Sequence, residues 1–278
     1  MVLNSIVWDV RPEIFSIPDN IALIGGLSVR WYSLLFAMSF IVGYILMKKI
    51  FENEGIGEKV LDQLSTYMLI FTIVGARLGH CLFYEPGYYL SHPIEILKIW
   101  EGGLASHGAA IGILAGLYFF SKANKKPFLW IMDRIVIVVA LAGFFIRMGN
   151  LMNSEIFGDV TSLPWGFVFT RYYDPALAVD ARHPTQIYEA FSYLLIFVFL
   201  FRSYWKVKGK TTNGELFGYF LVLLFSVRFL IEFIKVPQVG FEADMILNMG
   251  QILSIPFVLI GAYLLYMARQ KKGDHKVS

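Results

Sequence analysis

The stretch from Ile135 to Ile146 reads IVIVVALAGFFI, and it ends at a charged residue, Arg147. An apolar run of this kind is typical of a helix in lipid, where a spanning helix needs about 20 mostly apolar residues. Holding a guanidinium at hydrocarbon depth costs several kilocalories per mole, so such an arginine normally faces a partner, a cavity or a substrate. The stretch therefore predicts a membrane helix that carries a paired or functional charge at its end.

The composition of the whole chain also indicates a membrane protein. Of its 278 residues, 57% are hydrophobic and only 16% are charged, whereas about 25% are charged in an ordinary soluble domain. The single cysteine, Cys81, excludes a disulfide within the chain and a cysteine-rich metal site. We expect an all-α, polytopic membrane protein in which residues 1–278 form one integral membrane domain.

Hydropathy predicts seven transmembrane helices. They are 30–50, 63–84, 103–121, 130–148, 187–204, 214–234 and 246–268. Most lysines and arginines lie near one side of this bundle, and the positive-inside rule places that side in the cytoplasm. We therefore expect an extracytoplasmic N-terminus, a cytoplasmic C-terminus, and extracytoplasmic segments at about 85–102 and 149–186.

A dense polar string follows Arg147. Asn150 lies three residues later, on the same face if the helix continues, and Asn153, Glu155 and Gly158 come next. A polar helix terminus alone does not explain so many hydrogen-bonding side chains in so short a stretch. Because the arginine fork of donors matches a phosphate, the string predicts a phosphate-binding site at the outer end of the fourth helix.

Two more arginines lie inside predicted helices, and each has two interpretations. Arg228 and Glu232 are four residues apart, so they either neutralise each other as an ion pair or leave Arg228 facing a cavity as well. Arg77 either pairs with Glu232 or another carboxylate, or it contacts an anion, with Gly75 and Gly79 allowing a close approach.

Three other polar residues have a structural and a functional interpretation. His107 follows small residues in GGLASHG, and it is either a core histidine or a proton acceptor that a substrate can reach. Glu189, in HPTQIYE, is either part of a helix start or a site residue. Gln251 is either a hydrogen-bonding link between helices or a site residue.

Several motifs of catalytic chemistry are absent from the sequence. There is no His-Glu-x-x-His pair, no P-loop and no Gly-x-Ser-x-Gly elbow. We therefore expect no metal ion and no cofactor, and no nucleic-acid partner.

Six segments resemble the prolipoprotein diacylglyceryl transferase family, in the order in which that family has them, from about residue 28 to 268. They are VRWY at 29–32, GGLASHG at 102–108, RMGNLMNSEIFG at 147–158, HPTQIYE at 183–189, RFLIEF at 228–233 and GQILSIP at 250–256.

The most specific of these segments resembles the family pattern Gly-Arg-x-Gly-Asn-Phe-x-Asn-x-Glu-x-x-Gly. The chain departs from the pattern at Ile146, which replaces a glycine, and at Leu151, which replaces a phenylalanine. Elsewhere, Leu224 stands where the family often has tyrosine, and Lys235 stands where it often has arginine.

The resemblance implies transfer of the diacylglyceryl group of phosphatidylglycerol to the lipobox cysteine of a preprolipoprotein, forming a thioether and releasing glycerol phosphate. It implies His107 as the base, and Arg147 and Arg228 as the groups that stabilise the phosphate. Tyr32 is expected to contact the headgroup. The other expected binding and support residues are Asn150, Asn153, Glu155, Gly158, Arg77, Glu189, Glu232 and Gln251.

The resemblance also implies a place in the cell, a multi-pass protein of the bacterial plasma (inner) membrane with its site on the outer-leaflet side, and we expect it to work as a monomer. Intramembrane arginines alone would fit a transporter or flippase of an anionic lipid or metabolite equally well. No paired halves with broken helices are found, which favours the transferase. A membrane scaffold leaves the outer polar cluster unexplained.

Overall fold

The computed structural model describes residues 5–16, 28–99, 102–103, 105–236 and 245–277. The chain is mostly helical, and each of the seven ranges predicted from hydropathy coincides largely with a helix. Of the eight α-helices among the described residues, six are long and apolar enough to cross a membrane. They are α1 (Trp31–Asn53), α2 (Glu58–Phe83), α5 (Phe128–Met152), α6 (Thr185–Lys206), α7 (Glu215–Ile231, continued by the 3₁₀ turn η3 Glu232–Ile234) and α8 (Met249–Val277).

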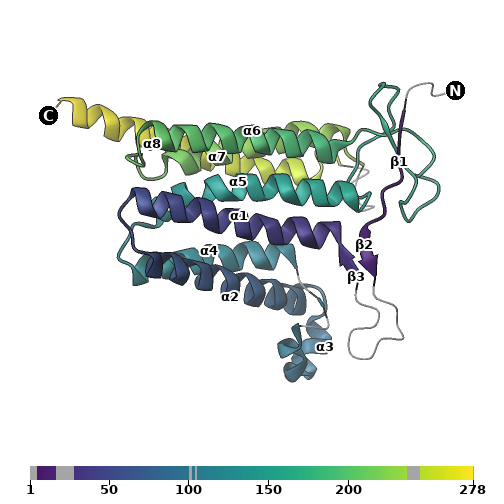
Figure 1. Ribbon diagram of the computed structural model, residues 1–278, viewed down its shortest axis with the longest axis horizontal. Coiled ribbons are helices and arrows are strands. Elements are labelled where there is room, and N and C mark those ends of the chain that lie inside the picture. Colours follow the sequence, from purple (N-terminus) through teal and green to yellow (C-terminus); the bar gives the residue numbers. More distant parts are fainter. Residues whose placement is uncertain (1–4, 17–27, 100–101, 104, 237–244, 278) are drawn as a thin grey trace. The chain divides into compact units, whose positions relative to one another are not determined.

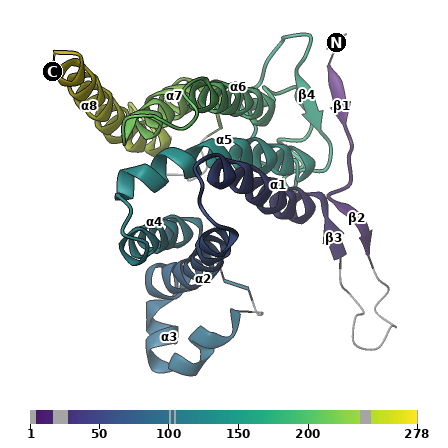
Figure 2. The same cartoon turned by 60° about the vertical axis from the view of Figure 1, so that its left-hand side comes forward.

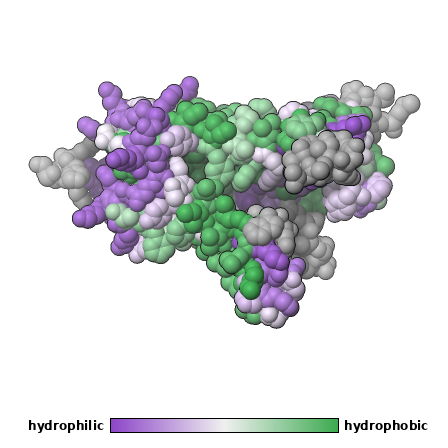
Figure 3. Space-filling view, turned by 60° about the horizontal axis from the view of Figure 1, so that its bottom comes forward, coloured by the Kyte–Doolittle hydropathy of each residue, from purple (hydrophilic) through white to green (hydrophobic). Residues whose placement is uncertain are grey.

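Many large apolar side chains of these helices are exposed, as lipid contact requires. Leu69, Leu195 and Leu259 are examples from three different helices, each more than half exposed. Figure 3 shows hydrophobic residues along the helical surfaces and hydrophilic residues gathered near helix ends. The expected helical membrane protein is confirmed at this level.

The chain divides into two compact units. Unit 1 comprises Met1–Leu46 and Ile135–Ser278, and unit 2 comprises Met47–Arg134. In unit 1, α6, α7 and α8 run side by side (Figures 1 and 2). Glycines bring α7 and α8 together, because a methyl group added at Gly261 would lie 2.8 Å from the carbonyl oxygen of Gly218.

Unit 1 also contains short strands that hydropathy did not predict. Strand β1 (Ile6–Trp8) pairs in parallel with β4 (Phe167–Phe169), and β2 (Glu13–Ser16) pairs antiparallel with β3 (Ser28–Arg30). The expectation of an all-α chain is corrected to this extent. Three-residue strands carry too little alternation to be seen in a sequence.

The connector between α5 and α6 has an apolar core of its own. Phe157, Phe167 and Phe169 of the connector are buried together with Leu151 at the end of α5. Leu151, which departs from the family pattern, therefore fills a packing position. Tyr172 borders this core, and desolvation together with a hydrogen bond to Tyr173 raises the pKa of its phenol to about 12. The core makes the connector a folded element rather than a tether.

In unit 2, α2 packs against α4 (Ser106–Ala123), and glycines form the tightest part of this contact. A methyl group on Gly79 would lie 2.6 Å from the Cα of Gly108, and one on Gly75 would lie 2.8 Å from the Cα of Gly112. Small residues four apart let membrane helices approach this closely. A short helix, α3 (Pro86–Ser91), and the 3₁₀ turn η1 (Pro93–Leu97) lie between α2 and α4 in the chain. Residues 100–101 of the predicted extracytoplasmic segment lie outside the described residues.

Candidate active site

Arg147 lies near the C-terminal end of α5 and is held by partners from the chain itself. Its Nε lies 3.0 Å from Oε2 of Glu189 on α6, and its Nη1 donates to Oδ1 of Asn150 at 3.3 Å. The Arg147 side chain is 13% exposed and Glu189 is fully buried. The predicted i,i+3 relation of Arg147 and Asn150 is confirmed. The guanidinium is therefore oriented by α5 and α6 together.

Glu155 is the second centre of hydrogen bonding. Its Oε1 accepts hydrogen bonds from the side-chain amides of Asn150 at 2.8 Å and Asn153 at 3.1 Å. Asn150 thus links Glu155 to Arg147. Asn150, Asn153 and Glu155, which follow the apolar run, therefore form one hydrogen-bonded set with Arg147.

Two residues at the start of α6 fix the backbone around Glu155. Gln186 donates from Nε2 to the carbonyl oxygen of Glu155 at 2.6 Å, and Thr185 donates from Oγ1 to that of Ile156 at 2.9 Å. Both side chains are fully buried. Much of the HPTQIYE motif therefore serves to tie the end of α5 to the start of α6.

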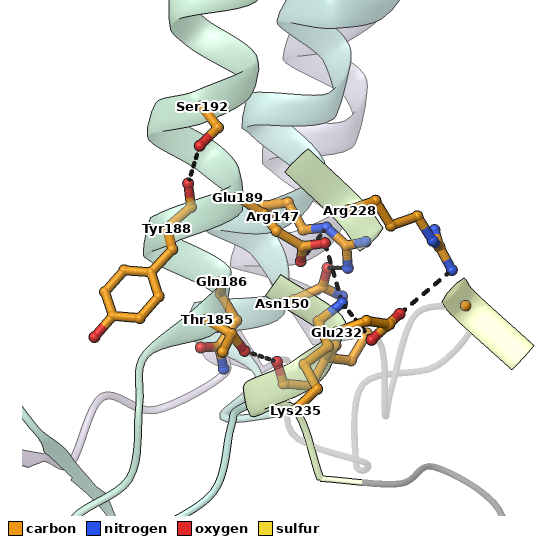
Figure 4. A network of polar contacts seen from close by, with 12 residues as sticks. Arg147, Asn150, Thr185, Gln186, Tyr188, Glu189, Ser192, Arg228, Glu232 and Lys235 are labelled. Atoms are coloured by element: carbon orange, nitrogen blue, oxygen red, sulfur yellow. Dashed lines mark hydrogen bonds and ion pairs between the residues drawn. The ribbon is translucent and has the colours of Figure 1, made fainter. Parts of the chain in front are cut away.

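A lysine continues the network from α6 to the end of α7. The Nζ of Lys235 lies 3.0 Å from Oε1 of Glu189 and 3.4 Å from Oε2 of Glu232. Glu232 in turn lies 3.8 Å from Nη2 of Arg228, whose side chain is 35% exposed. Figure 4 shows these side chains converging from α5, α6, α7 and the turn after α7. Arg228 is the most accessible cation of the network.

Two glycines allow the close contacts around this network. Gly158 forms an antiparallel bridge with Lys235, and a side chain on Gly158 would meet the carbonyl oxygen of Ile234. Gly149, two residues after Arg147, lies against Tyr32 of α1, because an added methyl group would lie 2.7 Å from Cδ2 of its ring. The backbone at Gly158 and Gly149 therefore brings Lys235 and Tyr32 to the Arg147 region.

Gln251 lies at the start of α8, where it caps the helix. The backbone N–H of Gln251 donates to Oδ1 of Asn248 at 2.8 Å, and the backbone N–H of Asn248 donates to Oε1 of Gln251 at 3.0 Å. This reciprocal pair is a capping box. The amide of Asn248 also donates to the carbonyl oxygen of Glu232 at 3.2 Å. Gln251 thus supports the end of the network by fixing where α8 begins.

Arg77 belongs to unit 2, where backbone carbonyls surround its guanidinium. It donates from Nε to Ile96 at 2.9 Å, from Nη1 to Gly102 at 2.6 Å and from Nη2 to Glu95 at 2.6 Å. Its side chain also lies over the ring of Tyr89, 5.0 Å from the ring centre. Arg77 therefore holds the segment between α2 and α4 in place, and neither its expected carboxylate partner nor an anion is needed to explain its burial.

His107 also belongs to unit 2, in the first turn of α4. Its side chain is exposed, whereas Gly108 beside it is buried against Gly75 and Gly79. The alternative of a buried core histidine is therefore excluded. The position of His107 depends on the glycine packing of α2 and α4.

Most of the residues predicted for the site lie together in unit 1. The connected or adjacent ones are Tyr32, Arg147, Asn150, Asn153, Glu155, Gly158, Glu189, Arg228 and Glu232. Three residues of the network were not predicted as site residues: Lys235, Gln186 and Tyr193. The hydroxyl of Tyr193 donates to Oε1 of Glu189 at 3.3 Å. The available signal for Lys235 was its place three residues after Glu232, which lets the two side chains meet at one helix end.

This arrangement is suited to binding an anion. Three cations, Arg147, Arg228 and Lys235, alternate with two buried carboxylates, so the guanidinium groups are held in place before any ligand arrives. Preorganised donors of this kind stabilise charge that develops during a reaction.

Comparison with known proteins shows the family to which the chain belongs. The family model described as prolipoprotein diacylglyceryl transferase matches residues 18–267. A phosphatidylglycerol–prolipoprotein diacylglyceryl transferase of Tolumonas auensis is 50% identical over 267 residues, which cover 96% of this chain and 98% of the relative. Proteins with the same name from Chloroherpeton thalassium and Porphyromonas gingivalis are 44% and 43% identical, each over 98% of both chains.

Proposed function

Because the chain belongs to the prolipoprotein diacylglyceryl transferase family, we propose that the network around Arg147 binds the phosphate of its lipid substrate. The chain is a transferase that moves the diacylglyceryl group of phosphatidylglycerol to a prolipoprotein, in lipoprotein maturation. The observation that carries the proposal is the pairing of Arg147 with fully buried Glu189, which holds a guanidinium in a fixed orientation within a membrane helix.

Two arginines stabilise the leaving group in this proposal. The acceptor is the lipobox cysteine of the preprolipoprotein, and its sulfur forms a bond to the diacylglyceryl carbon. The bond from that carbon to the phosphate oxygen breaks, and its electron pair stays on the oxygen. Arg147 and Arg228 face the charge that grows there, while Asn150, Asn153 and Glu155 hold Arg147 and the glycerol headgroup. Glycerol phosphate leaves, and a thioether remains.

His107 is the proposed base, as the family resemblance implies. A free cysteine thiol has a pKa of about 8.5, so most of it is protonated at neutral pH and a base increases the reactive thiolate. The exposed side chain of His107 supports this role because a substrate thiol, directly or through water, can reach it. Tyr32 contacts the lipid headgroup beside Gly149, and Arg77, Glu189, Glu232 and Gln251 support the site.

We also propose seven spans, with α4 as the seventh. The 18 residues of α4 are mostly apolar, and its glycines pack on those of α2 in the manner of membrane helices. An odd number of spans and the positive-inside rule then place the N-terminus outside and the C-terminus in the cytoplasm of a bacterial cell. The segments 85–102 and 149–186 face outward, and the site opens toward the outer leaflet of the plasma membrane. The chain works as a single membrane domain and a monomer.

Substitution of the arginines tests the proposed site. Purified Arg147→Ala, Arg228→Ala and His107→Gln variants are supplied with phosphatidylglycerol and a lipobox peptide, and glycerol phosphate release is measured. We expect Arg147→Ala to lower the rate by about 100-fold or more, as when a donor to a developing oxyanion is removed. A rate near that of the unchanged protein would refute the assignment.

Arg171→Ala is the matched control. Arg171 is an arginine of unit 1 that pairs with Asp9 at 2.8 Å, but both side chains are substantially exposed. Its loss should leave the rate nearly unchanged, since exposed ion pairs contribute little. Following radiolabelled lipid distinguishes the transferase from a transporter, because a transferase places the label on the peptide.

A further inference from the structure

Five charged side chains of unit 1 form a ladder in which the sign alternates. The order is Arg147, Glu189, Lys235, Glu232, Arg228, with neighbouring charges 3.0, 3.0, 3.4 and 3.8 Å apart. Lys235 is the middle member, and its side chain is only 3% exposed. The two arginines proposed to bind phosphate are the two ends of the ladder.

Lys235 determines the charge balance of this region. Arg147, Arg228 and Lys235 give three positive charges, and Glu189, Glu232 and nearby Glu155 give three negative ones. Without Lys235, two arginines would face three carboxylates. The region would then carry a net negative charge and would repel an anionic headgroup, with little solvent to screen the repulsion.

The geometry also makes Lys235 a spacer between the arginines. Its ammonium satisfies one oxygen of Glu189 and one of Glu232, and the other oxygen of each faces Arg147 and Arg228 respectively. Each carboxylate thus divides its two oxygens between the lysine and one arginine. An isolated buried carboxylate would instead draw its arginine closer, because burying an unpaired charge is costly.

We propose that Lys235 is a positioning residue that keeps Arg147 and Arg228 apart and available to the phosphate of the lipid substrate. This inference rests on the proposed function, which assigns the two arginines to that phosphate. Lys235 touches neither reactant and acts through Glu189 and Glu232.

Charge compensation tests the proposal. Lys235→Met removes the positive charge, and the double variant Lys235→Met/Glu232→Gln removes one charge of each sign, which restores the balance. In detergent micelles containing phosphatidylglycerol, we expect Lys235→Met to raise the KM for the lipid about tenfold or more, as an unscreened unit charge within the site would. The KM for the lipobox peptide should change little. The double variant should recover most of the lipid KM, and Lys235→Arg should stay near the unchanged protein.

The outcomes separate this inference from a structural role and from the proposed function. A double variant that is worse than Lys235→Met, or equal rises in both KM values, would overturn the positioning role. If Lys235→Met does not fold, Lys235→Gln replaces it, because the amide keeps hydrogen-bond donors near Glu189 and Glu232 but carries no charge. A lipid KM for Lys235→Gln near that of the unchanged protein would contradict the proposal. Lys272→Met, which breaks an exposed pair with Glu215, is the control. Failure of the proposed function would appear instead as an active Arg147→Ala variant.

Discussion

The two residues that flank Glu155, Ser154 and Ile156, adopt backbone conformations that are unfavourable for residues with a side chain. Ser154 has φ of 55° and Ile156 has φ of 60°, both in the left-handed region. That region costs a residue with a side chain roughly 1–2 kcal/mol, and for a β-branched residue such as Ile156 it is a true outlier. The hydrogen bonds from Gln186 and Thr185 to the neighbouring carbonyls hold this strained turn. The strain is the means by which the Glu155 carboxylate is turned toward Asn150 and Asn153.

Ser154→Gly should stabilise the protein. Ser154 is fully buried, and its hydroxyl has no hydrogen-bond partner among the described residues. Glycine adopts this φ without a steric cost and has no hydroxyl to leave unpaired, although it loses more chain entropy on folding. We expect the free energy of unfolding to rise by about 1 kcal/mol. Thermal unfolding in detergent should show a midpoint a few degrees higher. Ser154→Ala, which keeps the strain, should recover only part of the gain, and a lower midpoint for the glycine variant would contradict this account.

Among single residues, those in local patterns were predictable and those defined by distant partners were not. The Arg147–Asn150 contact follows from helical spacing. Lys235 acquires its role only when α6 brings Glu189 beside it, and no local pattern encodes that meeting. The role of Arg77 was equally hidden, since backbone carbonyls, which every residue has, leave no signature in the sequence.

At the scale of elements, the pair α2–α4 shows how a catalytic candidate is placed by backbone contact. Gly75, Gly79, Gly108 and Gly112 let the two backbones meet at the crossing, and aromatic side chains pack farther along the same two helices. The chain enters α4 through Gly102 and Gly103, which have φ of 91° and 68°. Arg77 of α2 holds this entry by donating a hydrogen bond to the carbonyl oxygen of Gly102, just ahead of His107. Most residues of the GGLASHG motif therefore have a structural role. Gly102 and Gly103 let the chain turn into α4, and Gly108, next to His107, lets α4 approach α2.

Gly108→Ala should damage this crossing. The new methyl group would lie 2.7 Å from the Cα of Gly79, and two backbones cannot yield as a side chain can. Overpacking of this kind costs about 1–3 kcal/mol, and the activity should fall with it because His107 is the adjacent residue. Gly87→Ala in α3 is the matched control, since a methyl group there meets nothing within 4 Å. Equal melting temperatures and activities for both variants would show that the crossing tolerates a side chain.

At the scale of the whole molecule, the helices were predictable and the connections were not. Lipid contact imposes long apolar runs, so hydropathy located the six helices of the described chain that could cross a membrane, and it also located α4. The strand pair β1–β4 joins residues that are far apart in the sequence, and the apolar core beneath it depends on that joining. The site was also predictable only in part. The residues at the end of α5 were predicted as a group, but their partners on α6 and after α7 were not all recognised.

Cysteine labelling in whole cells tests the proposed orientation and the crossing of α4. Cys81 is buried and can be replaced by serine to leave a cysteine-free background. Gly87→Cys and Asp180→Cys should react with a membrane-impermeant maleimide in intact cells. Lys125→Cys and Lys210→Cys should react only after lysis. Labelling of Gly87→Cys and Lys125→Cys from the same side would show that α4 does not cross the membrane.

The pairing of Arg147 with Glu189 has a consequence for the order in which the protein is made. Ribosomal synthesis delivers α5 before α6, so Arg147 reaches the membrane while its carboxylate partner has not yet been synthesised. An unpaired arginine in a membrane helix is costly, and Asn150 offers only a neutral partner. The end of α5 should therefore stay near the lipid surface, or within the insertion machinery, until α6 emerges and Glu189 arrives. The two helices then pack together, and the ion pair that orients the guanidinium also joins α5 to α6 before α7 and Lys235 are synthesised.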